Sequence, residues 1–243
     1  MIGLIGYGSF GKLMATHLSR HDKVLVYSKD VQKFSKNSKI KFSSLNEVAK
    51  LSVVIISVPM QSFEGVLHDI KNKLSPGALI IDVCSLKKFS CSAMDKILPK
   101  NVSIVGTHPL FGPQSCPKTI AGRKIAICNV RGNKLKSVQN FCEKKLKLKT
   151  IITTPDEHDK QMAYSQALTH YIGRVSVMMK VRDVQMSTKT YEDFLDIANL
   201  VKNDDMALFE NIETMNPYAV KVREEFLENA ENLHKSLLKK TKK

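Results

Sequence analysis

The segment that most constrains the fold of this 243-residue chain lies at its start, where three glycines separate an apolar run from a helical pattern. Residues 2–5 have the composition of a buried strand, and residues 6–11 follow as Gly-Tyr-Gly-Ser-Phe-Gly. Apolar residues then recur at helical spacing, at Leu13, Met14, Ala15 and Leu18. A strand, a glycine turn and a helix in this order are typical of the first unit of a Rossmann-type sheet.

Each glycine of this turn has a separate physical use. Gly6 permits a tight turn, Gly8 lets the backbone approach a diphosphate, and Gly11 lets the helix pack closely on the strand. Backbone amides at the helix start then face the negative charge. The sequence therefore predicts dinucleotide binding by five residues of the turn: Gly6, Gly8, Ser9, Phe10 and Gly11.

Further apolar runs alternate with helical patterns as far as about residue 150, which predicts an α/β fold with a doubly wound parallel sheet. From Pro155 onward the pattern is helical. We predict a dinucleotide-binding domain over residues 1–152 and a smaller all-helical domain for substrate binding and dimerisation over residues 153–243. The helical part is too small for a large core, so a homodimer through the C-terminal helices is expected. The predicted strands after the first lie in residues 24–27, 53–59 (a run that ends in the loop Ser57-Val58-Pro59), 78–83, 102–105 and 124–128.

The end of the second predicted strand bears on the choice of cofactor. NAD sites usually carry an acid here, for the ribose 2′-hydroxyl. This chain has Ser28 and Lys29 instead, and a hydroxyl with a cation suits the 2′-phosphate of NADP. Asp30 follows directly and keeps NAD open as the alternative. After the next strand, we expect the loop Ser57-Val58-Pro59 to line the nicotinamide side.

One histidine lies in a stretch that contains two prolines and two glycines, Val105 to Pro113. Such a stretch is expected to form a stiff, turn-like loop after a strand, and its His108 suits acid–base work near neutral pH. The alternative is a histidine that only caps a turn. Ligands of open α/β sheets bind at the carboxyl ends of the strands, and this favours the functional interpretation. The polar or glycine positions predicted at such ends are Gly8, Ser28, Ser57, Ser85 and His108.

Charge and composition narrow the classes of partner. Residues 1–150 hold 25 Lys and Arg against 8 Asp and Glu, whereas residues 151–243 hold 13 against 15. The basic part suits a small anionic substrate, and because many of its lysines fall on predicted helix faces we expect no nucleic acid as partner. Five cysteines without a Cys-x-x-Cys pair predict neither a metal site nor disulfides. No apolar run is long enough for a bilayer, and a first strand that starts at residue 2 leads us to expect a cytoplasmic protein without membrane contact.

Four blocks of the sequence together resemble the prephenate/arogenate dehydrogenases of tyrosine biosynthesis. Their order and spacing match that family, and their context is closest to its plant-type arogenate branch. The blocks are residues 6–11, residues 82–87 (Asp-Val-Cys-Ser-Leu-Lys), residues 106–113 (Gly-Thr-His-Pro-Leu-Phe-Gly-Pro), and residues 157–160 (Glu-His-Asp-Lys) leading into residues 165–170 (Ser-Gln-Ala-Leu-Thr-His).

The resemblance implies an NADP-linked oxidative decarboxylation, with hydride transfer to the nicotinamide. It implies that His108 accepts the proton of the substrate hydroxyl, or a hydrogen bond from it, and that Ser85 orients the imidazole. Ser85 could instead cap the helix that follows it. The residues expected to contact the substrate are Thr107, Gln166, His170 and Lys189.

Each contact predicted for the helical part has an alternative. Gln166 and His170 could be a satisfied buried pair, and Lys189 an ordinary exposed lysine at a helix start. Some bacterial members use an arginine near Tyr191 for a substrate carboxylate, whereas this chain has Glu192 there.

Two other function classes stay open at this point. One is a dehydrogenase of the same architecture that acts on 3-hydroxyacids or reduces imines; these usually rely on a lysine or a differently placed acid. The other is a protein without turnover that senses NADP(H) or binds nucleic acid through its basic part.

Overall fold

The computed structural model describes residues 1–29, 37–116, 119–202 and 205–241. The chain divides into two compact units, Met1–His158 and Asp159–Lys243. The division falls inside helix α6 (Pro155–Met162), whereas the sequence places it just before that helix. An α/β unit followed by a helical unit is the predicted fold class.

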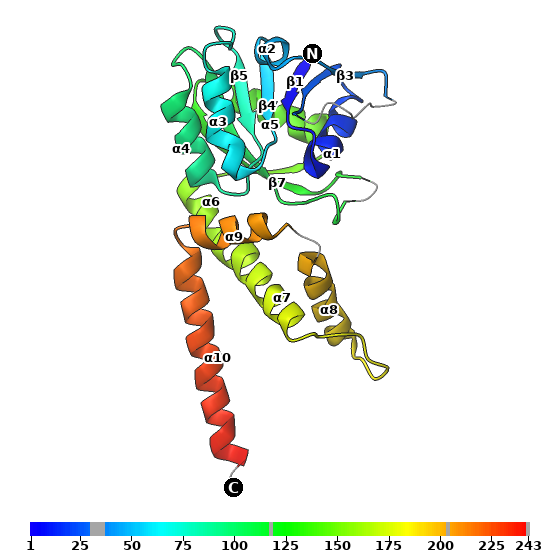
Figure 1. Cartoon of the computed structure of the whole chain (residues 1–243), viewed down its shortest axis with the longest axis vertical. Helices are drawn as coiled ribbons and strands as arrows, with labels where there is room; N and C mark the ends of the chain where they lie inside the picture. Colours follow the sequence, from blue (N-terminus) through cyan, green and yellow to red (C-terminus); the bar gives the residue numbers. More distant parts are fainter. Residues whose placement is uncertain (30–36, 117–118, 203–204, 242–243) are drawn as a thin grey trace. The chain divides into compact units, whose positions relative to one another are not determined.

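The first unit is built on one sheet with helices on both faces (Figure 1). Within the described residues the sheet has eight strands in the order β3-β2-β1-β4-β5-β6-β7-β8. The strands are β1 (Ile2–Ile5), β2 (Val24–Tyr27), β3 (Ile40–Phe42), β4 (Val53–Ile56), β5 (Leu79–Asp82), β6 (Ser103–Pro109), β7 (Lys124–Arg131) and β8 (Lys149–Ile152). Besides α6, the helices are α1 (Ser9–Leu18), α2 (Leu45–Ala49), α3 (Met60–Ile70), α4 (Lys87–Ile97) and α5 (Leu135–Lys144).

The sheet differs from the expected all-parallel one in the pairing of β6 with β7, which is antiparallel. Parallel neighbours need a crossover, usually a helix, and the described part of the connection between these strands contains none. Strands β3 and β8 were also not predicted. They have three and four residues and lie at the two edges of the sheet, where the apolar signal of a buried strand is weak.

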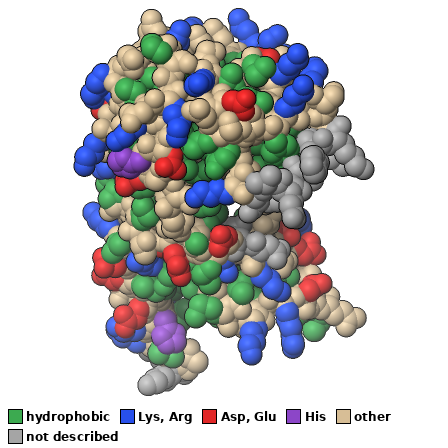
Figure 2. All heavy atoms as spheres, turned by 45° about the horizontal axis from the view of Figure 1, so that its top comes forward, with side chains coloured by type: hydrophobic (Ala, Val, Ile, Leu, Met, Phe, Trp, Pro, Cys, Tyr) green, Lys and Arg blue, Asp and Glu red, His purple; other side chains and the backbone are tan. Residues whose placement is uncertain are grey.

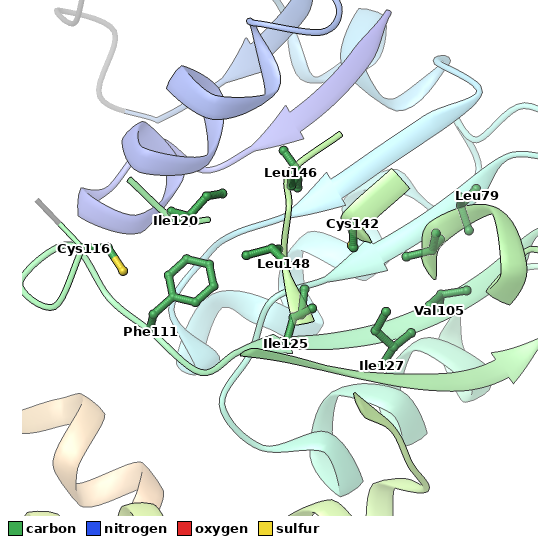
Figure 3. Packing of buried hydrophobic residues seen from close by; sticks show 11 residues of the cluster. Leu79, Val105, Phe111, Cys116, Ile120, Ile125, Ile127, Cys142, Leu146 and Leu148 are labelled. Carbon is green, nitrogen blue, oxygen red and sulfur yellow. The ribbon is translucent and has the colours of Figure 1, made fainter. Parts of the chain in front are cut away.

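Alternation along β1 explains why helices cover both faces. Ile2 and Leu4 join the hydrophobic cluster that contains Met14 and Leu18 of α1. Gly3 faces the other way, where an added Cβ would lie 2.9 Å from the carbonyl oxygen of Val48 in α2. A second cluster lies between strands β5 to β7 and helix α5 and continues into the loop after β6 (Figure 3). Its members include Leu79, Val105, Phe111, Ile125, Ile127 and Cys142.

In the part of the second unit that the structure describes, the end of α6 is followed by five helical elements. Its buried apolar cluster is small and contains Ala167, Ile212 and Ala219. Two helices cross closely at Gly173, where an added Cβ would lie 2.6 Å from Cγ2 of Val201. The elements are η1 (a π-helix, Ala163–Leu168), α7 (Thr169–Met178), α8 (Lys189–Lys202), α9 (Met206–Met215) and α10 (Ala219–Thr241).

None of the helices that the structure describes combines the length and the apolar character that crossing a bilayer requires. On the face drawn in Figure 2, Lys and Arg side chains are interspersed with neutral, hydrophobic and acidic surface.

Candidate nucleotide-binding and catalytic site

The register of the sheet aligns the ends of its central strands. Ile5 pairs with Ile56, Ile56 with Asp82, and Asp82 with Gly106. The residues that follow these four positions therefore emerge together at the end of the sheet formed by the carboxyl ends of its strands. They include Gly6, and also Ser57, Ser85 and His108, three of the five residues that the sequence predicted at strand ends.

The glycine turn after β1 has the geometry predicted for two of its glycines. Gly6 has a φ of +103°, and an added Cβ would lie 2.0 Å from the carbonyl oxygen of Ser57. At Gly11 an added Cβ would lie 2.3 Å from the carbonyl oxygen of Gly6. A larger residue at either position would therefore require the backbone to shift, and the predicted tight turn and close packing are confirmed.

Gly8 differs from these two, because it is exposed and an added Cβ would meet nothing within 4 Å. It is the N-cap of α1, without a side-chain cap and without an acid in the first turn of the helix. Amides at an uncapped helix start bind phosphate well, and open space at Gly8 leaves room for it. Of the other two turn residues, Ser9 is exposed and Phe10 is half-buried, with its ring 6.2 Å from that of Phe111. The turn therefore fits a dinucleotide diphosphate.

Two further loops border the turn. The amide of Gly6 donates to the carbonyl of Tyr27 at 2.8 Å, which brings Ser28 and Lys29 next to the turn; Ser28 is half-buried and Lys29 exposed. Asp30 lies outside the described residues. On the other side the amide of Ser57 donates to the carbonyl of Ile5 at 2.7 Å.

The loop that begins at Ser57 continues with Val58, which is half-buried, and ends at Pro59, the N-cap of α3. An added Cβ at Gly6 would lie 3.0 Å from Cγ1 of Val58. These residues thus lie beside the glycine turn, and their contact with a nicotinamide stays a prediction.

His108 lies within strand β6, where it pairs with Ala126 of β7, and not in a turn-like loop as the prolines and glycines suggested. Strand pairing, which continues to Pro109, makes this backbone stiff. The side chain is only 6% exposed. Its Nδ1 lies 2.9 Å from Nε2 of His158 in α6, and the two ring centroids are 5.1 Å apart.

The environment of His108 keeps its imidazole neutral. Burial, followed by electrostatic interaction with His158 and with Lys87, holds the pKa of His108 well below its usual value. A neutral imidazole keeps one lone pair, which is what a proton acceptor needs.

A buried ion pair supports the strand just before His108. Lys87 and Asp82 form a salt bridge in which neither side chain has any exposed surface. The ammonium also donates to the carbonyl oxygen of Thr107 at 2.7 Å, and the amide of Thr107 donates to Asp82 at 3.2 Å. Burial by itself would lower the pKa of Lys87, but the Asp82 carboxylate, acting together with the nearby thiols of Cys91 and Cys84, outweighs burial and raises that pKa. Thr107, predicted to contact substrate, is itself buried in this network.

The sequence analysis missed the role of Lys87, although a signal was present. Lys87 is the first residue of α4, where the helix dipole disfavours a positive charge. A lysine at such a position after a strand that ends in Asp82 indicates an ion pair with that acid. The sequence gives no comparable sign that His158 meets His108.

Ser85 does not orient the imidazole in the way that the resemblance implied. It is half-buried and forms no hydrogen bond with any residue that the structure describes. The contact at Nδ1 of His108 is made by His158 instead.

The other residues predicted to contact substrate belong to the helical unit. Gln166 lies in the π-helix η1, and His170 lies in the first turn of α7; both are half-buried. The side-chain oxygen of Gln166 is buried without a hydrogen-bond partner among the described residues. π-Helical turns are frequent at functional sites. Arg174, not singled out from the sequence, lies one turn beyond His170 with its guanidinium 5.4 Å from the ring centroid of Phe209.

Lys189 begins α8 and its side chain is 77% exposed. It forms a salt bridge with Asp193, one turn along the same helix, at 2.8 Å. The hydrogen bond to Asp193 raises the pKa of Lys189. This pairing favours the alternative interpretation, an exposed lysine at a helix start.

The described residues contain no group of three or more His, Cys, Asp or Glu side chains that could hold a metal ion. The five cysteines are buried and free.

Comparison with known proteins gives a consistent result. Residues 14–145, more than half of the chain, match the family described as "Prephenate dehydrogenase, nucleotide-binding domain". Arogenate dehydrogenase 2, chloroplastic, of Arabidopsis thaliana is 30% identical over 97% of this chain and 69% of its own length. A Methanocaldococcus jannaschii protein named "Probable arogenate/prephenate dehydrogenase" is 27% identical over 94% of this chain, which spans 54% of that relative.

The fold is similar to that of solved members of the family. The crystal structure of prephenate dehydrogenase from A. aeolicus, in complex with hydroxyphenyl propionate and NAD+, superposes with a TM-score of 0.79 at 20% identity. The match covers 100% of this chain and 92% of that one. The resemblance of the motifs, the family match and the fold thus agree, and the chain belongs to the prephenate dehydrogenase family.

Proposed function

We propose that this protein is an NADP-linked arogenate or prephenate dehydrogenase of tyrosine biosynthesis, which decarboxylates its substrate as it oxidises it. The observation that carries the proposal is that the glycine turn and His108 both lie at the carboxyl ends of the central strands. The register of β1, β4, β5 and β6 brings the glycine turn and His108 to the same edge. A phosphate cradle and a neutral imidazole at one edge suit the oxidation of a hydroxyl-bearing carbon.

When it is bound, the nicotinamide would accept a hydride from the ring carbon that bears the substrate hydroxyl. The protein must take the proton of that hydroxyl, and His108 supplies an uncharged acceptor for it. The ion pair of Lys87 with Asp82 fixes the backbone at Thr107 and thereby the start of the His108 side chain. Gln166 and His170 are proposed to bind the substrate from the helical unit.

The proposed preference for NADP depends on the loop after β2. A hydroxyl at Ser28 and an ammonium at Lys29 complement a 2′-phosphate, and the exposed position of Lys29 lets it reach a bound ligand.

The surroundings of Lys87 argue against the first alternative function, a dehydrogenase for 3-hydroxyacids or imines that uses a lysine near its substrate. The ammonium of Lys87 is fully buried and engaged with Asp82 and with the carbonyl of Thr107. It therefore supports the strand of His108 and is not presented to a ligand.

The direct test is a steady-state assay with arogenate and prephenate, each with NADP and with NAD. We expect reduction of the cofactor and release of carbon dioxide in equal amounts, faster with NADP. The proposal would be contradicted if the protein turned over neither substrate and instead bound DNA tightly, with an affinity that depends strongly on salt. That result would favour the non-catalytic alternative.

We also propose that a second copy of the chain packs on α10. Phe226, Ala230, Leu233 and Leu237 recur at spacings of four, three and four, typical of a coiled-coil seam. Leu233 and Leu237 are 62% and 54% exposed in the single chain. Light scattering should give the mass of a dimer, and Leu233→Asp with Leu237→Asp should reduce it to that of a monomer. A wild-type chain that is monomeric at micromolar concentration would contradict this assembly.

A further inference from the structure

The two ring nitrogens of His108 have different surroundings, and the hydrogen bond at one decides what the other can do. Nδ1 of His108 lies 2.9 Å from Nε2 of His158, and both side chains are buried, with exposed fractions of 6% and 3%. When both rings are neutral, a hydrogen bond between these two nitrogens contains a single hydrogen, which belongs either to Nδ1 of His108 or to Nε2 of His158. The pair therefore has two arrangements.

The two arrangements have opposite consequences for Nε2 of His108. If Nδ1–H of His108 donates to His158, Nε2 of His108 keeps a lone pair and can accept a proton. If Nε2–H of His158 donates to His108, the hydrogen of His108 sits on Nε2, which then cannot act as a base. A histidine side chain without a partner favours its hydrogen on Nε2, so a base that works through Nε2 needs an acceptor at Nδ1.

We infer that His158 is a positioning residue for His108, whose Nε2 accepts the hydrogen bond from Nδ1–H of His108 and so leaves Nε2 of His108 free for the substrate hydroxyl. The inference rests on the proposed function for its kinetic consequence. The position of the hydrogen, however, is a property of the free protein and can be measured without substrate.

The neighbouring side chains leave this task to His158. Ser85 forms no hydrogen bond with His108. The ammonium of Lys87 is engaged with Asp82 and with the carbonyl of Thr107. The backbone of His158 is fixed as well, because its amide donates to the carbonyl of Thr154 at 2.9 Å at the start of α6.

Electrostatics favours a neutral His108. Lys87 and His158 both disfavour a charge on His108 and lower its pKa, in addition to the effect of burial. A charged His158 would have hydrogens on both nitrogens, so it would donate to Nδ1 and impose the inactive arrangement. The inferred arrangement therefore places the single hydrogen of His158 on its Nδ1.

The first experiment is nitrogen NMR of the whole protein labelled with ¹⁵N-histidine, at pH 7.5 and without ligands. The signals of His108 are assigned from their loss in His108→Asn. We expect the hydrogen of His108 on Nδ1 and a bare Nε2. A hydrogen on Nε2 of His108 in the wild-type protein would overturn the inference, whatever the protein catalyses.

The second experiment compares His158→Phe, which keeps a ring but no acceptor, with His158→Gln, whose amide oxygen can accept from Nδ1–H. We expect kcat of the Phe variant to fall by about tenfold or more, with KM and cofactor Kd within about twofold of wild type. The Gln variant should recover most of the lost kcat. His17→Phe is the matched control, because His17 is also buried but lies in α1, and its kcat should be unchanged.

The outcomes separate this inference from the proposed function. Wild-type kcat in His158→Phe would overturn the inference, as would an equal loss of kcat in the Gln and Phe variants. If the wild-type protein turns over neither arogenate nor prephenate, the proposed function fails, and the NMR experiment still decides where the hydrogen lies. If the Phe variant does not fold, the Gln variant and the wild-type spectrum decide.

Discussion

The ammonium of Lys87 donates a hydrogen bond to the backbone carbonyl of Thr107 at 2.7 Å, twenty residues further along the chain and directly before His108. The same ammonium pairs with Asp82, and all three side chains are buried. The start of helix α4 and the ends of strands β5 and β6 are thereby joined at one point. The proposed base depends on this junction for its position.

Replacing Lys87 with Met should destabilise the first unit, because it leaves the Asp82 carboxylate buried without its partner. Breaking a buried pair from one side costs about 3–5 kcal/mol of the free energy of unfolding. The matched control is Lys88→Met, which removes a partly exposed lysine paired with Asp156 and should cost at most about 1 kcal/mol. Urea unfolding of both variants measures the difference, and equal stabilities would refute the role given to Lys87.

Two glycines of the same turn should respond differently to alanine. Gly11→Ala places a Cβ 2.3 Å from the carbonyl oxygen of Gly6 and should cost about 1–3 kcal/mol of stability. Gly8→Ala meets no atom within 4 Å, so the protein should fold while its cofactor Kd rises by about tenfold, or ~1.4 kcal/mol. Thermal unfolding and cofactor titration check both. A Gly8→Ala variant that binds NADP as tightly as wild type would argue against a diphosphate at this turn.

Changing Lys29 to Asp should reverse the cofactor preference, because the carboxylate repels a 2′-phosphate and accepts a hydrogen bond from a 2′-hydroxyl. We expect the ratio of kcat/KM for NADP to that for NAD to fall by about tenfold or more. Lys23→Asp makes the same charge change just before β2, at the opposite end of the strand, and should leave the ratio unchanged. If the two variants shift the ratio equally, the effect is one of overall charge and the assignment of Lys29 is wrong.

Because the pKa of His108 is lowered in the folded protein, the free energy of unfolding should decrease as the pH falls. The folded protein keeps this imidazole neutral, whereas the unfolded chain takes up a proton near pH 6.5. His108 therefore contributes stability above that pH, and the contribution is lost as the pH falls through the unfolded pKa towards the lower folded one. The free energy of unfolding should decrease less between pH 7.5 and pH 5.5 in His108→Asn than in wild type. An identical pH dependence of the two proteins would contradict the neutral, buried state.

The sequence predicts the part of the fold that local patterns determine. Apolar runs and the glycine turn identify the central strands and the position of Gly6 and Gly11, because those features depend on residues close together in the chain. The antiparallel pairing of β7 with β6 was not predicted, because the sequence pattern does not show that the described part of the connection after Pro109 contains no helix. The edge strands β3 and β8 escaped because short, exposed strands carry little apolar signal.

In the candidate site, too, features that depend on neighbouring residues could be predicted, whereas contacts between distant residues could not. His108 could be found from its local context, and its place at the ligand-binding edge follows from the order of strands. Its partner His158 is fifty residues further along the chain, and no local sequence pattern predicts that its helix contacts β6. The resemblance implies that Ser85 orients the imidazole, whereas the contact at Nδ1 of His108 in the structure is with His158.

The central claim is that His108 takes part in the reaction but not in holding the cofactor. The most direct measurement is kcat of His108→Asn with its preferred substrate, together with the Kd of NADP for the same protein. We expect kcat to fall by about 10²-fold or more while Kd stays within about twofold of wild type. Turnover at the wild-type rate in this variant would contradict it.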